Sequence, residues 1–235
     1  MANPGAGNIA AENGFTKYNS MFCWEPIWFK VEDQLFCVPR SGFAAAKDSV
    51  FDNMFSVPTS DEPVEGRDKE HPIGLEANKK DVICLLKYMY PTITHFVVDQ
   101  TTVAIQLEKE EWVSVLKLAT KWDMTDIRKT AIQSLSVTNV LTSTEKLSLG
   151  REFRVRDWVA EGIKALTQNT GMRSVHLRVH GWETAAQILD IRSRSAYQDS
   201  GLFGSGRSAV YIDAEKARQF TESVFAAELK EYEQA

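Results

Sequence analysis

Two stretches of the chain, LKLATKWDMTDIRKTAIQSL at residues 116–135 and LSLGREFRVRDWVAEGIKAL at residues 147–166, repeat one another thirty-one positions apart. Leucine, aspartate and isoleucine recur at matching positions, and Trp122 falls on Phe153. Apolar positions therefore coincide, and so do the polar residues between them. Each copy predicts a helix, a short turn and a second helix. Stacked helix pairs bury one another and present a surface, which is typical of proteins that bind proteins.

The composition is that of an ordinary globular protein. The chain has 235 residues, of which 43% are hydrophobic and 25% charged, with a formal net charge of −5. That length is sufficient for one large domain or two small ones. Its basic residues are scattered, whereas a nucleic-acid surface needs clustered Lys and Arg to contact phosphates. We therefore expect no nucleic-acid partner.

Cysteine spacing and the distribution of apolar residues bear on the compartment. Cys23, Cys37 and Cys84 show no paired spacing, which favours reduced thiols over disulfides or a zinc site. No apolar run approaches the roughly 18 residues of a membrane span, and no signal-peptide pattern opens the chain. We expect a cytoplasmic or nuclear protein without a membrane partner.

The first half of the chain predicts a hairpin followed by helices. Residues 1–14 are small and polar and are expected to be disordered, whereas residues 15–30 carry six aromatic side chains that are buried either in their own domain or against a second chain. Residues 27–40 predict a β-hairpin, because β-branched and aromatic residues flank a polar turn at residues 32–34, and Pro39 is expected to end its second strand. Ser41 is expected to cap a helix over residues 41–55. A short strand at 71–75 and helices at 79–91, from 109 and from Thr125 as N-cap complete this half.

The last part of the chain predicts more helix. Residues 181–192 form a helix, and the Gly/Ser-rich residues 198–210 read as a flexible loop. Asp213 is expected to cap a final helix over residues 214–232. Its apolar stripe is Phe220, Val224 and Ala227. This helix either folds back on the body of the protein or docks on a partner.

The sequence offers no constellation that requires catalysis, a cofactor or a metal. GLFGSG at residues 201–206 lacks the glycine spacing and the βαβ context of a dinucleotide-binding turn. His176 and His180 share a face of either a helix or a strand, but a metal site needs a further ligand, and Glu183 is the local candidate. Carboxylates such as Asp126 lie where helix dipoles and solvation explain them. We therefore expect a protein that is not an enzyme.

The ordered set of segments resembles a BTB/POZ domain. Its members here are LFCVPRSGFAAAKDSVFDNMF, HPIGLEANKKDVICLLKYMYP and EWVSVLKLATKWDMTDIRKTAIQSL, and the resemblance covers about residues 24–136. KLSLGREFRVRDWVAEGIKAL is similar to the start of the BACK-like helical extension that follows many such domains. The layout, including WETAAQILDIR, is similar to BTB-containing proteins abundant in fungi.

The resemblance implies a helical cluster flanked by a small sheet, α+β and mostly helical, followed by an α-helical extension. It implies a non-enzymatic protein–protein interaction module, a scaffold or adaptor that forms a homodimer with itself and presents its extension to an unknown protein. In many members the N-terminal helix and the first long helix form the dimer interface. In this chain those segments place the following residues at the interface: Tyr18, Met21, Phe22, Trp24, Phe43, Ala44 and Lys47.

Two other functions remain as hypotheses. Family members that recruit a cullin-type ubiquitin ligase often carry an apolar-x-Glu motif after the first long helix. Here Val64 and Glu65 are adjacent, with no residue between them, so the sequence does not match the motif that a cullin partner would need. The third hypothesis is an enzyme with a site between the two helix pairs.

The domain organisation that follows from the repeat and the resemblance has five parts. Residues 1–14 are the N-terminus, 15–139 the BTB/POZ-like domain, 140–192 the helical extension, 193–212 a flexible loop and 213–235 the C-terminal helix. The two copies meet at a seam, which predicts that Trp122, Ile127, Phe153 and Trp158 are core residues of that junction rather than a cofactor pocket.

Overall fold

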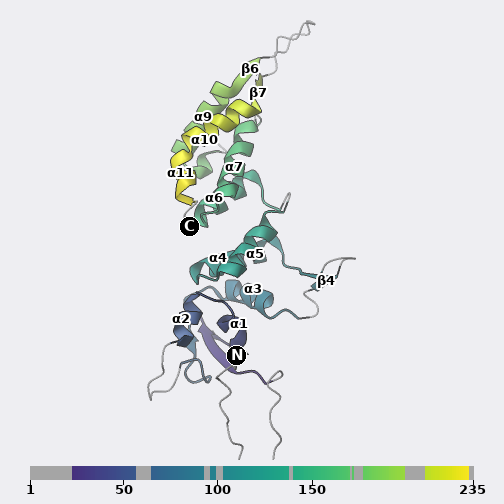
Figure 1. The fold of residues 1–235 in the computed structure, drawn as a ribbon, viewed down its shortest axis with the longest axis vertical. Helices are drawn as coiled ribbons and strands as arrows, with labels where there is room; N and C mark the ends of the chain where they lie inside the picture. The colour runs from purple at the N-terminus through teal and green to yellow at the C-terminus, as the bar shows by residue number, and fades with distance from the viewer. Residues whose placement is uncertain are drawn as a thin grey trace, which may run out of the picture. The chain divides into compact units, whose positions relative to one another are not determined.

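A computed structural model describes residues 23–56, 65–92, 96–98, 103–137, 140–169, 171, 177–198 and 210–232 of the chain. Its contacts divide the chain into two compact units, Met1–Lys79 and Lys80–Ala235. Helices dominate and short strands accompany them (Figure 1). The predicted α+β, mostly helical class with a small sheet is confirmed. Residues 1–14 lie outside the described part.

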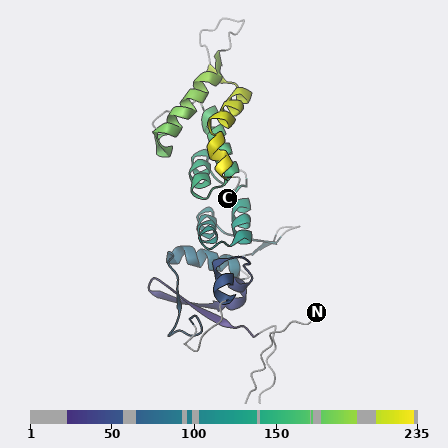
Figure 2. The ribbon, with the colours of Figure 1, turned by 60° about the vertical axis from the view of Figure 1, so that its left-hand side comes forward.

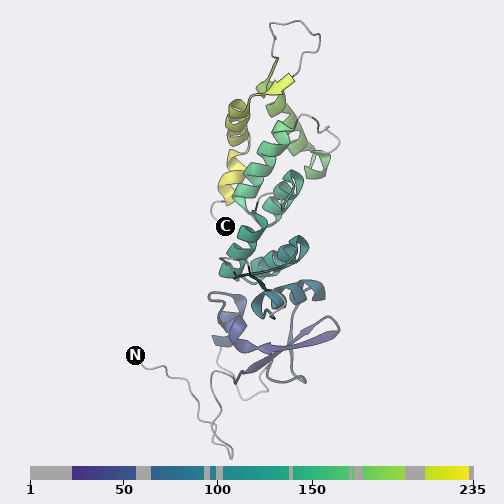
Figure 3. The same cartoon turned by 90° about the vertical axis from the view of Figure 1, so that its right-hand side faces the viewer.

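The hairpin of the first unit is the one that the sequence predicts (Figure 3). Strand β1 (Pro26–Val31) pairs antiparallel with β2 (Gln34–Pro39) over their full length. The turn begins at Glu32, whose φ is 53°, and continues through Asp33. Strand β3 (Ile73–Gly74) pairs in parallel with β1, which gives the order β2-β1-β3 and places β1 in the centre.

Three phenylalanine rings form the core of this unit and bind its helices to the sheet. Phe29 of β1 lies 4.8 Å from Phe43 of α1 (Arg40–Ala44) and 5.8 Å from Phe51 of α2 (Val50–Ser56), measured between ring centroids. The rings are tilted or edge-on and at most 2% exposed. Such pairs add about 0.5–1.5 kcal/mol each beyond the area that they bury.

The single helix predicted from Ser41 onward is wrong, because a local cap interrupts it. Pro39, not Ser41, occupies the N-cap of α1. The chain then turns through Asp48, whose φ is 60°, before α2 begins. The Ser49 hydroxyl accepts a hydrogen bond from the Asp52 N–H, and the Asp52 carboxylate accepts one from the Asp48 N–H, both at 3.2 Å. Side chains that satisfy backbone donors in this way start a new helix rather than continue an old one.

The second unit opens with a buried polar contact between helices. Helix α3 (Lys79–Met89) presents Asp81, which is 9% exposed, to α4 (Lys109–Lys121). The Asp81 carboxylate accepts hydrogen bonds from the Ser114 hydroxyl at 2.8 Å and the Lys117 ammonium at 2.7 Å. In the sequence between α3 and α4, two three-residue strands, β4 (Phe96–Val98) and β5 (Val103–Ile105), pair as a ribbon in a segment that the sequence left unassigned.

The repeat is confirmed down to its turns. Helices α4 and α5 (Thr125–Leu135) form the first pair, and α6 (Ser143–Glu152) and α7 (Arg156–Gln168) form the second. Asp123 and Arg154, thirty-one positions apart, both adopt left-handed φ angles of 55° and 53°. The following N–H groups donate to the carbonyls of Ala119 and Gly150 at 2.8 Å, the six-to-one bond of a Schellman turn.

One cap in the first pair differs from its prediction. Thr125, expected as an N-cap, is the first residue of α5, and Met124 occupies the cap without a side-chain bond. In the second pair Thr142 caps α6 through a reciprocal capping box with Glu145. The corresponding helices of the two pairs therefore start alike: α4 also begins with a capping box, formed by Glu108 and Glu111, and α7, like α5, follows an apolar N-cap residue, Val155, that makes no side-chain bond.

The C-terminal helices fold back on the second pair (Figure 2). They are α9 (Trp182–Ser195), α10 (Ala214–Val224) and α11 (Ala226–Glu231), and a short 3-10 turn, η2 (Arg178–His180), precedes them. Their buried side chains join those of α6 and α7 in one apolar cluster: Leu147, Val159, Ile163, Leu166, Leu177, Ala185, Ile188, Ile191, Ala217, Phe225 and Leu229. The open question of the last helix is thus answered, because it packs within its own chain.

Two expectations for this region need correction. The predicted loop at residues 193–212 is helical to Ser195 and then forms an antiparallel ribbon of β6 (Ala196–Gln198) and β7 (Val210–Ile212). The predicted single terminal helix breaks at Phe225. The break shifts the buried face, so that Ala227 of the expected stripe is exposed.

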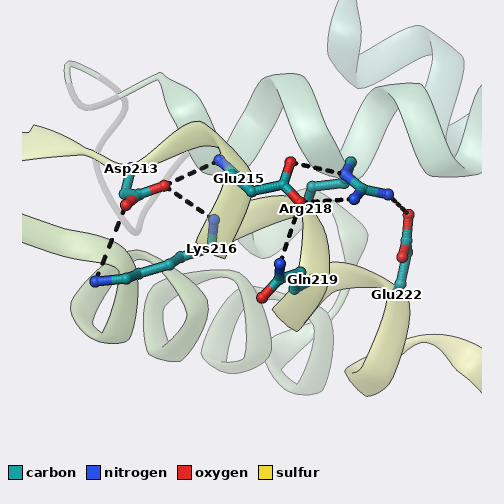
Figure 4. A network of polar contacts seen from close by, with 6 residues as sticks. All are labelled: Asp213, Glu215, Lys216, Arg218, Gln219 and Glu222. Carbon is teal, nitrogen blue, oxygen red and sulfur yellow. Dashed lines mark hydrogen bonds and ion pairs between the residues drawn. The ribbon is translucent and has the colours of Figure 1, made fainter.

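The outer side of α10 carries a polar network, shown in Figure 4. Asp213 caps the helix by accepting hydrogen bonds from the N–H groups of Glu215 and Lys216 at 3.0 Å, as its sequence predicted. The Arg218 guanidinium donates to Glu215 at 2.7 Å and to Glu222 at 2.8 Å. The hydrogen bond from Arg218 holds the pKa of Glu215 below its usual value. These contacts stabilise the helix from its solvent side.

Candidate interaction surfaces

The predicted interface residues separate into three groups. Tyr18, Met21 and Phe22 lie outside the described residues. Trp24 is 66% exposed just before β1, and two further members of the predicted set, Ala44 and Lys47, are half-buried and exposed respectively. The placement of Phe43 at an interface is wrong, because its side chain is 1% exposed and packs inside its own unit.

A face of the hairpin gathers exposed apolar side chains beside Trp24. Alternation along the strands points Ile27, Phe29 and Val31 into the core and the residues between them away from it. We call the opposite side the outer hairpin face, defined by Trp28, Lys30, Leu35 and Cys37, which pair across the strands as Trp28 with Cys37 and Lys30 with Leu35. Leu35 is 48% exposed, Cys37 is exposed and Trp28 is half-buried.

A second surface lies in the second unit, between the first helices of the two pairs. We call it the α4–α6 groove. It has a volume of about 370 Å³ and is lined by Lys109, Glu110, Val113, Thr144, Glu145, Ser148, Leu149 and Val179. Its lining combines apolar side chains, Val113, Leu149 and Val179, with charged ones, Lys109, Glu110 and Glu145. This combination suits an apolar side chain of a partner protein rather than a small polar substrate.

An ion pair closes one edge of the α4–α6 groove. The Lys109 ammonium lies 2.8 Å from the Glu145 carboxylate, which also accepts hydrogen bonds from the backbone and side chain of Thr142. The hydrogen bond from Lys109, and after it the one from the Thr142 backbone, lowers the pKa of Glu145 to about 2. Glu145 therefore stays ionised at neutral pH. It fixes the start of α6 and the edge of the groove together.

Val179, which lines this groove, and Trp182, three residues further along the chain, are exposed apolar residues. Val179 of η2 is 73% exposed and Trp182 of α9 is 67% exposed. The Arg178 guanidinium lies over the Trp182 ring, 4.5 Å from its centroid. Exposed Trp beside Arg is a combination enriched at protein interfaces. Sequence reasoning missed both residues, because exposure is decided by how η2 and α9 pack.

The residues considered as metal ligands or catalytic carboxylates lie where a structural role accounts for them. Among the described residues, no three His, Cys, Asp or Glu side chains are grouped as a metal site would require. His176 lies outside the described part, and His180 belongs to a 3-10 turn rather than a strand. Asp126 is 97% exposed in the first turn of α5, where the helix dipole favours a carboxylate.

Two guanidinium groups in the second unit, buried Arg192 and half-buried Arg128, also cap helix ends. The Arg192 guanidinium donates to the carbonyls of Leu166 and Thr167 at the end of α7, and Arg128 donates to the Phe153 carbonyl at the end of α6 at 2.8 Å. Burial lowers the pKa of both guanidinium groups. Their hydrogen bonds satisfy backbone carbonyls at the ends of α6 and α7, which have no partner within their own helix.

Comparison with known protein families finds no family model that matches the chain, and comparison with curated proteins finds no match. Within the described residues, no helix combines the length and the apolar character needed to cross a bilayer. Residues 57–64, which include Val64 of the unmatched cullin motif, lie outside the described part.

Proposed function

We propose that this chain is a non-enzymatic protein–protein interaction module of the BTB/POZ type and that it works as a homodimer. The observation that carries the proposal is the outer hairpin face with Trp24 beside it, where large apolar side chains meet water. Burying an apolar surface in an interface stabilises the complex by about 25 cal/mol per Å² removed from water. A second copy placed against the hairpin would remove part of this apolar surface, including Leu35, from water.

The order of elements supports the BTB/POZ type. A hairpin is followed by two short helices, a short strand, a further helix and two stacked helix pairs. In this proposal residues 15–139 are the dimerising domain and the helices that follow are an extension. We assign the extension to a second protein partner, because the exposed Trp182 and Val179, which lines the α4–α6 groove, lie there. The module acts by holding that partner, and no residue is given a catalytic role.

Light scattering of the intact chain tests the homodimer. We expect a mass twice that of the 26.5 kDa chain at tens of micromolar protein. Trp24→Ser should weaken the dimer, since exposed Trp side chains are frequent interface anchors. Trp182→Ser removes an equally exposed Trp from the extension and serves as the matched control. A mass that stays at one chain across a concentration series would refute the homodimer.

Affinity purification tests the second partner. The intact chain and a Val179→Lys, Trp182→Ser variant are compared as baits in extract from the native cell. We expect both baits to retain the second copy of the chain and only the intact one to retain the partner, because the two substitutions lie in the extension. Equal recovery of every partner by both baits would remove this surface from the proposal.

A further inference from the structure

Strand β2 presents an open edge to solvent. Among the strands that the structure describes, β2 pairs with β1 alone. The Trp28 N–H donates to the Gly66 carbonyl at 2.8 Å, and the Lys30 carbonyl accepts from the Leu75 N–H at 2.9 Å. Trp28 and Lys30 therefore direct their backbone groups away from β2. In an antiparallel pair, two residues that lie opposite one another direct their N–H and C=O groups either both toward each other or both away. The residues of β2 opposite Trp28 and Lys30 therefore direct their backbone groups away from β1.

Those partners are Cys37 and Leu35. Their N–H and C=O groups point to the free edge, and their side chains belong to the outer hairpin face. Edge strands are commonly protected by charged side chains, by an internal proline or by a bulge. The stretch QLFCV at residues 34–38 has none of these, and its pairing with β1 is regular throughout. It is the kind of edge on which another strand pairs.

We infer that β2 pairs antiparallel with β2 of a second copy, across a two-fold axis at Phe36, so that the two hairpins form one continuous sheet. This inference rests on the proposed homodimer and names the contact that forms it. An edge strand is self-complementary under a two-fold axis, since each N–H meets a C=O of the other copy. In this register Leu35 lies opposite Cys37 of the second copy, and the half-buried Phe36 meets its own counterpart.

Charge favours this arrangement over a parallel one. The acidic turn residues Glu32 and Asp33 stand at one end of β2 and Arg40 at the other. Antiparallel pairing about Phe36 places Glu32 opposite Arg40 of the second copy at both ends of the ladder. Parallel pairing would place like charges together instead. Cross-strand pairs of opposite charge and of aromatic rings both stabilise a sheet.

Disulfide trapping tests the register, with Cys23→Ser as the background. Residues directly opposite in such a ladder have Cα atoms about 5.5 Å apart, within the range of a disulfide, whereas diagonal neighbours lie about 7–8 Å apart. Leu35→Cys should therefore link two chains through the native Cys37 on mild oxidation. Leu35→Cys with Cys37→Ser should not, and neither should Cys37 alone. Efficient linking by Cys37 alone would place the axis elsewhere and overturn the inference.

A matched pair of charge variants tests the edge without new cysteines. Leu35→Lys places a charge on the edge strand, and Val50→Lys places the same charge on α2, where Val50 is 45% exposed. We expect Leu35→Lys to raise the dimer dissociation constant at least tenfold and Val50→Lys to leave it within about twofold, with unchanged circular dichroism. A monomeric parent chain would refute the homodimer itself. A dimeric parent that Leu35→Lys leaves intact would overturn only the β2 contact.

Discussion

The approach of α6 to α7 leaves no space for a side chain at Gly162, so Gly162→Ala is expected to destabilise the chain. A Cβ at this position would lie 2.8 Å from the Leu147 nitrogen and 3.0 Å from the Ser143 carbonyl oxygen. Both are backbone atoms of α6, which cannot turn aside as the end of a flexible side chain can. The two helices would have to separate by several tenths of an ångström along a buried seam.

The magnitude follows from two opposing effects. Alanine is better than glycine in a helix interior by about 1 kcal/mol. Adding a methyl group to a full core costs about 1–3 kcal/mol, and contact with backbone places Gly162 in the upper part of that range. We therefore expect a net loss of about 1–2 kcal/mol in the free energy of unfolding. Gly74→Ala, whose Cβ would meet nothing within 4 Å, should change it by less than about 0.5 kcal/mol.

The assay is urea unfolding of the intact chain, followed by circular dichroism and by Trp fluorescence. Coincident transitions are checked first, because the chain has two compact units. The repeat supplies an opposite substitution, since Ala131 is the residue of the first pair that matches Gly162 and it is fully buried. Ala131→Gly should also cost about 1 kcal/mol or more. A gain in stability from Gly162→Ala would refute the close approach.

Three further substitutions or conditions have defined outcomes. Arg192→Ala removes the buried guanidinium that donates hydrogen bonds to two carbonyls of α7. It should lower the free energy of unfolding by about 2–4 kcal/mol in the same urea assay. Thr142→Ala removes the capping box of α6 and should cost about 1 kcal/mol, whereas Thr144→Ala in the same turn should cost less. Burial and then the Arg151 charge lower the pKa of His180 below its usual 6.5, so the folded state takes up its proton later than the unfolded state as pH falls. The contribution of neutral His180 to the free energy of unfolding is complete above about pH 6.5 and is lost as pH falls through the folded pKa. His180→Gln should remove that part of the dependence of stability on pH below about pH 6.5, and an unchanged slope would exclude His180 as its source.

Local patterns in the sequence were enough to predict the elements whose residues stabilise one another along the chain. The hairpin follows from β-branched and aromatic residues on both sides of the polar turn at residues 32–34. The repeat predicts where each helix pair turns, even though Asp123 and Arg154, rather than glycine, adopt the left-handed conformation there. The apolar pattern on both sides of each turn fixes the helix faces, so the residue between them has to accept that conformation.

The errors arose where a nearby polar group or distant packing decided the outcome. The cap formed by Ser49 and Asp52 divides a stretch that periodicity alone reads as one helix. Phe43 was placed at an interface because the resemblance assigns the first long helix to the dimer interface, and an aromatic side chain loses contact with water equally well in its own core or against a second chain. Composition does not separate these two outcomes. The positions of Phe29 and Phe51 in the folded unit do.

The contacts of the second helix pair explain why the repeat stops at two copies. The second pair is joined to the first by polar contacts at three places: Lys109 with Glu145, Arg128 with the Phe153 carbonyl, and the Trp158 indole with the Ser136 hydroxyl at 2.7 Å. The buried rings of Trp122, Phe153 and Trp158 lie at this seam, and the matching Ile127 is half-buried.

A helix pair in a stack has one further apolar face, which the next pair would normally cover. Here α9, α10 and α11 cover it, through the cluster that contains Ile163, Ile188 and Phe225. The opposite side of α10 carries the charged network of Figure 4, which offers no apolar surface to a third pair. Terminal elements with a polar outer face end such stacks. Among the described residues, large exposed apolar side chains lie instead at Val179 and Trp182, on the hairpin, and on the β6–β7 ribbon, where Tyr197 and Tyr211 are half exposed.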